Sequence, residues 1–320
     1  MKDLIQIETK GILEGIVLDG PANVFGDEFT CREPTDDELS AVGKMIPVAK
    51  RYLQSRRQFV RVLESTSEIP GKDAFEACDI AARRMGAFVT ALRLTSEGEL
   101  CCRVISANPL GGKSNTKLYP VSYYSSHDQG IRALVGSENP LSLGEKDVKA
   151  ARDFWSISAD LLCNPESVKS LELAVERFNW SYLRHSDADK FIDLMIAMEV
   201  ILLDPSDSEE VTFKLALRGS LLAIEMADAE ERRERFKRLK ELYKIRSHVV
   251  HGISSKKPRY QLSSQVVVEF RAYVRQCLRR ILVLLARKAG SKTDGISSVL
   301  QKLDLAALSA ATDDDTLFRY

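Results

Sequence analysis

The chain has 320 residues, 44% hydrophobic and 29% charged, with a formal net charge of zero, a composition that excludes disordered and fibrous proteins and accommodates about two globular domains. Its longest apolar stretches are well short of the ~20 residues that cross a bilayer, and its first residues do not form a secretory signal. We therefore expect a cytoplasmic protein without a membrane-spanning segment.

Residues 1–144 carry a mixed pattern of strands and helices. Thr35 is expected to cap a helix whose Glu38 completes a capping box, and residues 59–63 fit either a helix or a strand. Two short strands, separated by Gly11, are expected before a turn at Asp19-Gly20-Pro21. In chain order we expect strands at residues 4–7 and 12–18, helices at 35–53 and 73–94, a strand at 100–105, and a loop with a short strand at 108–126.

After residue 144 the apolar residues follow helical spacing only. Pro165 after Asn164 is typical of a helix start, and Gly252 stands where the fifth of these helices would stop. The expected helices cover residues 145–162, 166–183, 188–203, 210–226, 229–251 and 264–288, with a final segment from Ile296. The predicted fold is mostly α, with a helical bundle at 145–320 after a smaller mixed α/β domain at 1–144.

Basic residues are concentrated in the second half of the chain. Residues 231–290 contain 17 Lys or Arg and 4 Glu, so this stretch has a formal charge of +13 and the remainder −13. Such a separation suits a polyanionic partner. Solvated helix faces beside an acidic surface would give the same count, so composition leaves both interpretations open.

The helix expected at 229–251 ends in two of the four histidines. On a wheel of about 100° per residue, one side carries Lys240, Lys244, Ser247, His248 and His251. The apolar side carries Phe236, Leu239, Leu242, Tyr243, Val249, Val250 and also Arg246. An unpaired buried charge is unfavourable, so we expect Arg246 to approach Glu199, which lies in an apolar run expected at the centre of the bundle. A buried ion pair without catalytic use fits the same pattern.

Arg246 and His251 lie about 140° apart on that wheel. One copy of the helix is therefore not expected to close a site alone. Two copies related by a two-fold axis would surround one cleft with two arginines and two histidines, which suits a polyphosphate strand. We therefore expect a homodimer.

Residues 246–251, Arg-Ser-His-Val-Val-His, resemble the R-x4-6-H motif of HEPN domains, and the wider string at 242–252 is similar to the Apea-like HEPN subfamily. An R-x4-H alone occurs by chance in many helices, so the flanking strings carry the resemblance. Segments at 177–179, 192–199 and 213–218 also resemble that subfamily, and residues 91–94 resemble it more weakly.

The resemblance implies a dimeric bundle, often a metal-independent endoribonuclease of antiphage defence or toxin systems, with no cofactor and with RNA, tRNA included, as substrate. In that chemistry the ribose 2′-hydroxyl attacks the adjacent phosphate and leaves a 2′,3′-cyclic phosphate. His251 would transfer protons and Arg246 would bind the phosphorane. Ser247, where many relatives carry Asn, would orient His251 or contact phosphate. Glu199 and His248 would support the site.

The RNA backbone is expected to be attracted by the basic side chains Lys240, Lys244, Arg275 and Arg279, with Arg271 and Arg280.

The alternative function is that of a HEPN scaffold without catalysis, a dimerisation or nucleotide-sensing module whose Arg246 and His251 only hold the core together. Residues 1–144 show no P-loop, Rossmann glycine pattern, nucleophile elbow or metal-ligand cluster that would make them an enzyme in their own right. From the layout we expect them to sense a trigger, bind a regulatory partner or restrain the nuclease.

Overall fold

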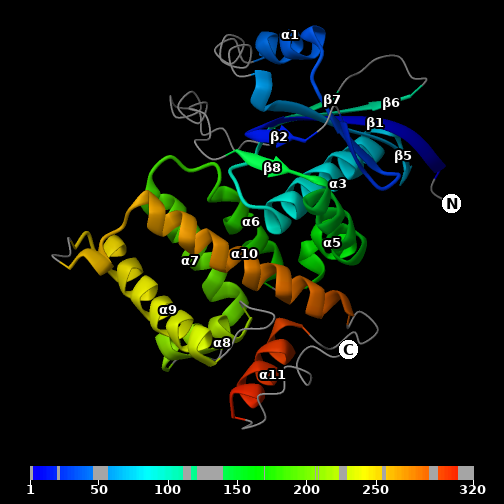
Figure 1. Ribbon diagram of the computed structural model, residues 1–320. Coiled ribbons are helices and arrows are strands. Elements are labelled where there is room, and N and C mark those ends of the chain that lie inside the picture. The colour runs from blue at the N-terminus through cyan, green and yellow to red at the C-terminus, as the bar shows by residue number, and fades with distance from the viewer. Residues whose placement is uncertain are drawn as a thin grey trace. The chain divides into compact units, whose positions relative to one another are not determined.

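The computed structural model describes residues 3–19, 22–45, 57–110, 117–120, 140–168, 170–205, 207, 209–222, 229–253, 257–287 and 295–308. Over these residues the chain divides into two compact units, Met1–Cys163 and Asn164–Tyr320 (Figure 1). The predicted mostly α-helical fold with a mixed N-terminal part is confirmed, because all described strands lie in the first unit. None of the described helices is both long enough and apolar enough to cross a membrane.

The first unit is built on a six-stranded antiparallel sheet. In spatial order its strands are β3 (Ala22–Phe25), β4 (Phe29–Arg32), β5 (Val60–Gly71), β1 (Asp3–Glu14), β6 (Cys101–Pro109) and β7 (Lys117–Pro120). A separate parallel pair joins β2 (Ile16–Leu18) to β8 (Leu141–Leu143). Residues 59–63, for which the sequence allowed a helix or a strand, form the end of the short helix η1 (Arg57–Phe59) and the start of β5.

Helix α3 (Ala74–Thr95) covers one face of this sheet, and its Ala77 and Ala81 share a buried cluster with Ile7 of β1. Gly11 lies inside β1, where a Cβ would come within 2.9 Å of Met85 Sδ. The expected break at Gly11 is therefore wrong, since this glycine admits α3 close to a continuous strand. The chain breaks instead at Gly15, with φ +79°.

Helix α5 (Glu145–Cys163) packs against α3 within the first unit. The rings of Trp155 and Phe88 lie 5.3 Å apart between centroids, and Trp155 Nε1 donates a hydrogen bond of 2.8 Å to Glu28. We expected the boundary after residue 144, whereas the compact unit continues through Cys163. This buried aromatic contact explains why the helix belongs with the sheet rather than with the bundle.

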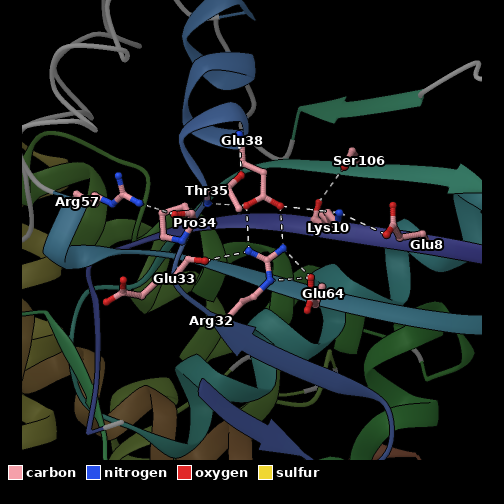
Figure 2. Close-up of polar contacts among 10 residues, drawn as sticks. All are labelled: Glu8, Lys10, Arg32, Glu33, Pro34, Thr35, Glu38, Arg57, Glu64 and Ser106. Atoms are coloured by element: carbon pink, nitrogen blue, oxygen red, sulfur yellow. Dashed lines mark hydrogen bonds and ion pairs between the residues drawn. The ribbon is translucent and has the colours of Figure 1, made fainter. Parts of the chain in front are cut away.

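A polar network joins α1 (Asp36–Met45) to the sheet face opposite α3 (Figure 2). Arg32 donates to both carboxylate oxygens of Glu38, at 2.8 and 3.0 Å, and to Glu64 at 3.0 Å. The predicted capping box is present, because the backbone N–H of Thr35 donates to Glu38 and that of Glu38 donates to the Thr35 hydroxyl. The hydrogen bond from Arg32 outweighs burial and holds the pKa of Glu38 at about 2. The expected extension to residue 53 lies outside the described residues.

The second unit is a helical bundle with α7 (Asp187–Leu202) at its centre, in contact with α6 (Leu171–Trp180), α8 (Val211–Leu222), α9 (Ala229–Val250) and α10 (Ser264–Arg287) (Figure 1). The helix expected at 166–183 is divided at Ser170, which has φ +74°. The bundle also contains α11 (Ile296–Leu308) and the short helices η2 (Pro165–Ser167) and η3 (Pro258–Tyr260).

Short ion pairs tie these helices together. Asp193 of α7 is buried and accepts a hydrogen bond of 2.9 Å from Arg177 of α6. Arg218 of α8 is also buried and donates to Asp207 at 2.6 Å and to Asp304 of α11 at 2.7 Å. Arg177 and Arg218 therefore both hold helices of the bundle together.

Candidate functional site

The way α9 ends determines where His251 lies. The N–H of Ile253 donates to the carbonyl of His248 at 2.8 Å, and that of Gly252 donates to Val249 at 3.3 Å. Gly252 has φ +63°. These features define a Schellman motif in which His251 is the C-cap residue, directly after the last residue of α9. Its side chain is exposed, and a protonated imidazole there would face the negative end of the helix dipole.

The buried face of α9 is formed by Leu239, Leu242 and Ile245. Val250 was expected on that face, yet it is 52% exposed. It lies about 80° from Leu242 on the helix wheel, at the edge of the face. The buried face of α9 is therefore centred closer to Ile245, and farther from Val250, than the sequence predicted.

Around the same helix, Arg246 and His251 point to different sides. Arg246 lies about 40° from Leu242 and His251 about 180° from it. In the described part of the chain no hydrogen bond joins the two side chains. Ser247 is half-buried, and its carbonyl accepts the helix hydrogen bond of His251 at 3.1 Å. One copy of α9 therefore offers both groups to solvent without bringing them together.

The expected approach of Arg246 to Glu199 of α7 is observed. Arg246 Nε lies 3.6 Å from Glu199 Oε1, just beyond hydrogen-bond distance, and the arginine side chain is 34% exposed. Glu199 Oε1 is buried and has no hydrogen-bond partner among the described residues. Burial raises the pKa of Glu199, and the charge of Arg246 opposes this rise. The pair is loose, so the guanidinium retains donors for a ligand.

Tyr243 completes this group. Its ring centroid lies 5.8 Å from Arg246 Cζ. Burial raises the pKa of Tyr243, with Glu199 adding to the rise and Arg246 opposing it. Glu199, Tyr243 and Arg246 thus form one polar group between α7 and α9.

His248 was expected on the open side of the helix beside His251. Instead it packs edge-on against Tyr260 of η3, with ring centroids 6.0 Å apart and planes at 89°. Its Nδ1 is buried without a hydrogen-bond partner among the residues that the structure describes. The same Tyr260 ring has Lys244 Nζ at 4.7 Å and Arg259 Cζ at 4.8 Å from its centroid. His248 is therefore a packing partner of Tyr260.

The cations expected to attract RNA do not all reach the surface. Lys240, Lys244 and Arg279 are exposed. Arg275 is only 9% exposed, and Arg271 is buried and donates to a backbone carbonyl at 2.8 Å. The prediction that Arg271 and Arg275 face the RNA is therefore wrong, because both lie on the face of α10 that packs into the bundle.

Sequence reasoning did not single out Arg259 or Tyr260. The string Lys-Lys-Pro-Arg-Tyr at 256–260, an aromatic residue among cations, was the available signal.

Over the described ranges, no three His, Cys, Asp or Glu side chains are grouped closely enough to hold a metal ion. Scans of the chain against protein-family models, curated proteins and solved structures found no match, so the site is interpreted from its own geometry.

Replacing Gly252 with Ala should lower the free energy of unfolding by about 1–2 kcal/mol, because an L side chain is strained in the left-handed conformation. No atom of the described residues lies within 4 Å of an added Cβ, so the expected cost is that of the backbone conformation. Gly252→Asn should cost less, since Asn tolerates this conformation. Urea unfolding followed by circular dichroism measures both variants. An equal loss in the two would contradict this account.

Glu199→Gln should stabilise the protein more at pH 7 than at pH 4. The folded-state pKa of Glu199 is raised above its ordinary 4.5. Its stabilising contribution is therefore full below pH 4.5 and lost as the pH rises through the folded-state pKa. Glutamine does not ionise and avoids that loss. Urea unfolding at pH 4, 5.5 and 7 tests this, with the exposed Glu172→Gln as control. A difference that does not vary with pH would refute it.

Proposed function

We propose that the second unit is a HEPN-type endoribonuclease that cleaves RNA by attack of a ribose 2′-hydroxyl on the adjacent phosphate. The observation that supports this most directly is the end of α9, where a partly exposed guanidinium and an exposed imidazole lie five residues apart. Both groups are accessible to a phosphodiester. They are the residue types that this chemistry needs, at the spacing of the R-x4-6-H pattern.

The proposed reaction is a transesterification. O2′ forms a bond to phosphorus, and the bond from phosphorus to O5′ of the next nucleotide breaks, which leaves a 2′,3′-cyclic phosphate and a 5′-hydroxyl. One imidazole accepts the proton of the 2′-hydroxyl and one imidazolium donates a proton to O5′. His251 provides these groups, one from each of two chains. Arg246 binds the non-bridging oxygens as their negative charge develops.

A second copy of the chain completes this site. Arg246 and His251 are separated by about 7.5 Å along the helix axis and about 140° around it, and each chain brings one His251. Two-fold pairing of two α9 ends would place both residue types on one phosphodiester. Val250 and Ile253 flank His251 and are 52% and 54% exposed, which provides apolar surface for this contact.

A second candidate function is a HEPN module that dimerises or senses a nucleotide without cleaving RNA. The observation that favours it is the Glu199–Arg246 pair, because a guanidinium beside a half-buried carboxylate also serves a purely structural role. For either function, the first unit is proposed to sense a trigger or bind a regulatory partner. A role in antiviral defence or a toxin-type stress response rests on the resemblance of the sequence alone.

The nuclease proposal is tested by incubating the full chain with total RNA or tRNA in EDTA. Wild type should release fragments with 2′,3′-cyclic phosphate ends, identified by mass spectrometry. His251→Ala should cut about 10²–10⁴-fold more slowly, because proton transfer is lost. The matched control is His185→Ala, an exposed histidine outside α9, which should cut like wild type. Intact RNA with wild type, or equal cutting by His251→Ala, would refute the proposal.

The dimer is tested by size exclusion with light scattering at micromolar concentration. Wild type should elute with twice the chain mass of 35.8 kDa. Val250→Asp should shift the protein toward monomer and slow cleavage, because a charge replaces apolar contact surface. Val268→Asp, at a similarly exposed valine of α10, should remain dimeric. A wild-type monomer under these conditions would count against the two-chain site.

A further inference from the structure

Two cations are held against one aromatic ring beside the end of α9. Lys244 of α9 and Arg259 of η3 lie 4.7 and 4.8 Å from the centroid of Tyr260. The negative face of an aromatic ring attracts cations, so Tyr260 keeps two positive charges close together. We call Lys244, Arg259 and Tyr260 the η3 cluster.

Neither cation of the η3 cluster is closely neutralised by a carboxylate. Lys244 is exposed and has no ion pair within the described part of the chain. Arg259 Nη1 has Glu241 at 4.0 Å, and that carboxylate also accepts a hydrogen bond of 3.1 Å from Arg238. Two adjacent positive charges with little compensation form a site suited to an anion.

His248 fixes the ring that holds these cations. It packs edge-on against Tyr260 and lies one helical turn after Lys244. This contact links η3 to α9, so the position of the η3 cluster is tied to the helix that carries His251.

The η3 cluster is in line with the proposed cleavage site. Lys244 and His251 are seven residues apart, so they lie only about 20° apart around α9 and about 10 Å apart along it. A strand that runs along this side of the helix with one phosphate at His251 would bring the phosphate of a neighbouring nucleotide to Lys244. Arg246, about 140° from His251, lies off this line.

We propose that Lys244 and Arg259, held on Tyr260, form a subsite for the sugar-phosphate backbone of RNA next to the scissile phosphate. The inference rests on the proposed function for the position of the second phosphate, but binding at the subsite requires no cleavage. Because phosphates carry no sequence information, the subsite positions the strand without selecting bases.

The probe is a fluorescent 2′-O-methyl RNA oligonucleotide, which lacks the attacking hydroxyl and stays intact by the proposed route. Fluorescence anisotropy gives its Kd for the full chain over a series of salt concentrations. Each phosphate contact contributes about 0.7 to the slope of log K against log salt for single strands. Lys244→Gln with Arg259→Gln should therefore lower the slope by about 0.7 to 1.4 and weaken binding at low salt by about tenfold.

The matched control replaces Arg233 and Lys237, two exposed cations of α9 that pair with Glu230 and Glu234. This double change to Gln should leave the Kd and the slope closer to those of wild type. Tyr260→Phe keeps the ring and should bind like wild type, whereas Tyr260→Leu should bind more weakly. Circular dichroism confirms that each variant is folded.

The outcomes separate the subsite from the nuclease proposal. Wild-type binding with a reduced slope in the Lys244–Arg259 double variant supports the subsite, even if no RNA is ever cut. A wild-type slope and Kd in that variant, or losses equal to those of the control, refute the subsite even if RNA is cut. Failure of wild type to bind the oligonucleotide also refutes it.

Discussion

The backbone turn at Gly252 is the constraint on which the geometry of the second unit's candidate site depends. Its left-handed conformation follows the end of α9 at Val250 and leaves the side chain of the C-cap residue, His251, on the side opposite Leu242. Helix η3 packs against the same α9, so that Tyr260 contacts Lys244 and His248. The proposed proton-transfer residue and the cations proposed to hold the neighbouring phosphate are thus both positioned by α9.

The ion pairs of the second unit differ in how completely they are satisfied. Arg177 and Arg218 make hydrogen bonds of 2.9 Å or less to their carboxylates, as expected of groups that hold a bundle together. Arg246 lies 3.6 Å from Glu199, whose Oε1 lacks a hydrogen bond among the described residues. At this distance the electrostatic attraction offsets little of the cost of burying the two charges. If a phosphate oxygen took the place of Glu199 beside Arg246, the guanidinium would gain short, charge-assisted hydrogen bonds.

Local pattern predicted much of the secondary structure and part of the site. The capping box of Thr35 and Glu38, the helices at residues 73–94 and 229–251, and the stop at Gly252 depend on interactions within a few residues, which periodicity and cap residues encode. The approach of Glu199 to an arginine of α9 was also predictable, because a charge in an apolar helix has few possible partners.

What the sequence by itself determined was therefore where most of the helices form and which of their charges need partners. Only the tertiary structure decided that Gly11 lies beneath Met85 inside a strand, that Arg275 is buried, and that His248 packs on Tyr260. The physical reason is that each of these outcomes depends on contacts between separate elements. A helix wheel shows which residues share a side, but the packing of neighbouring elements decides which side is covered.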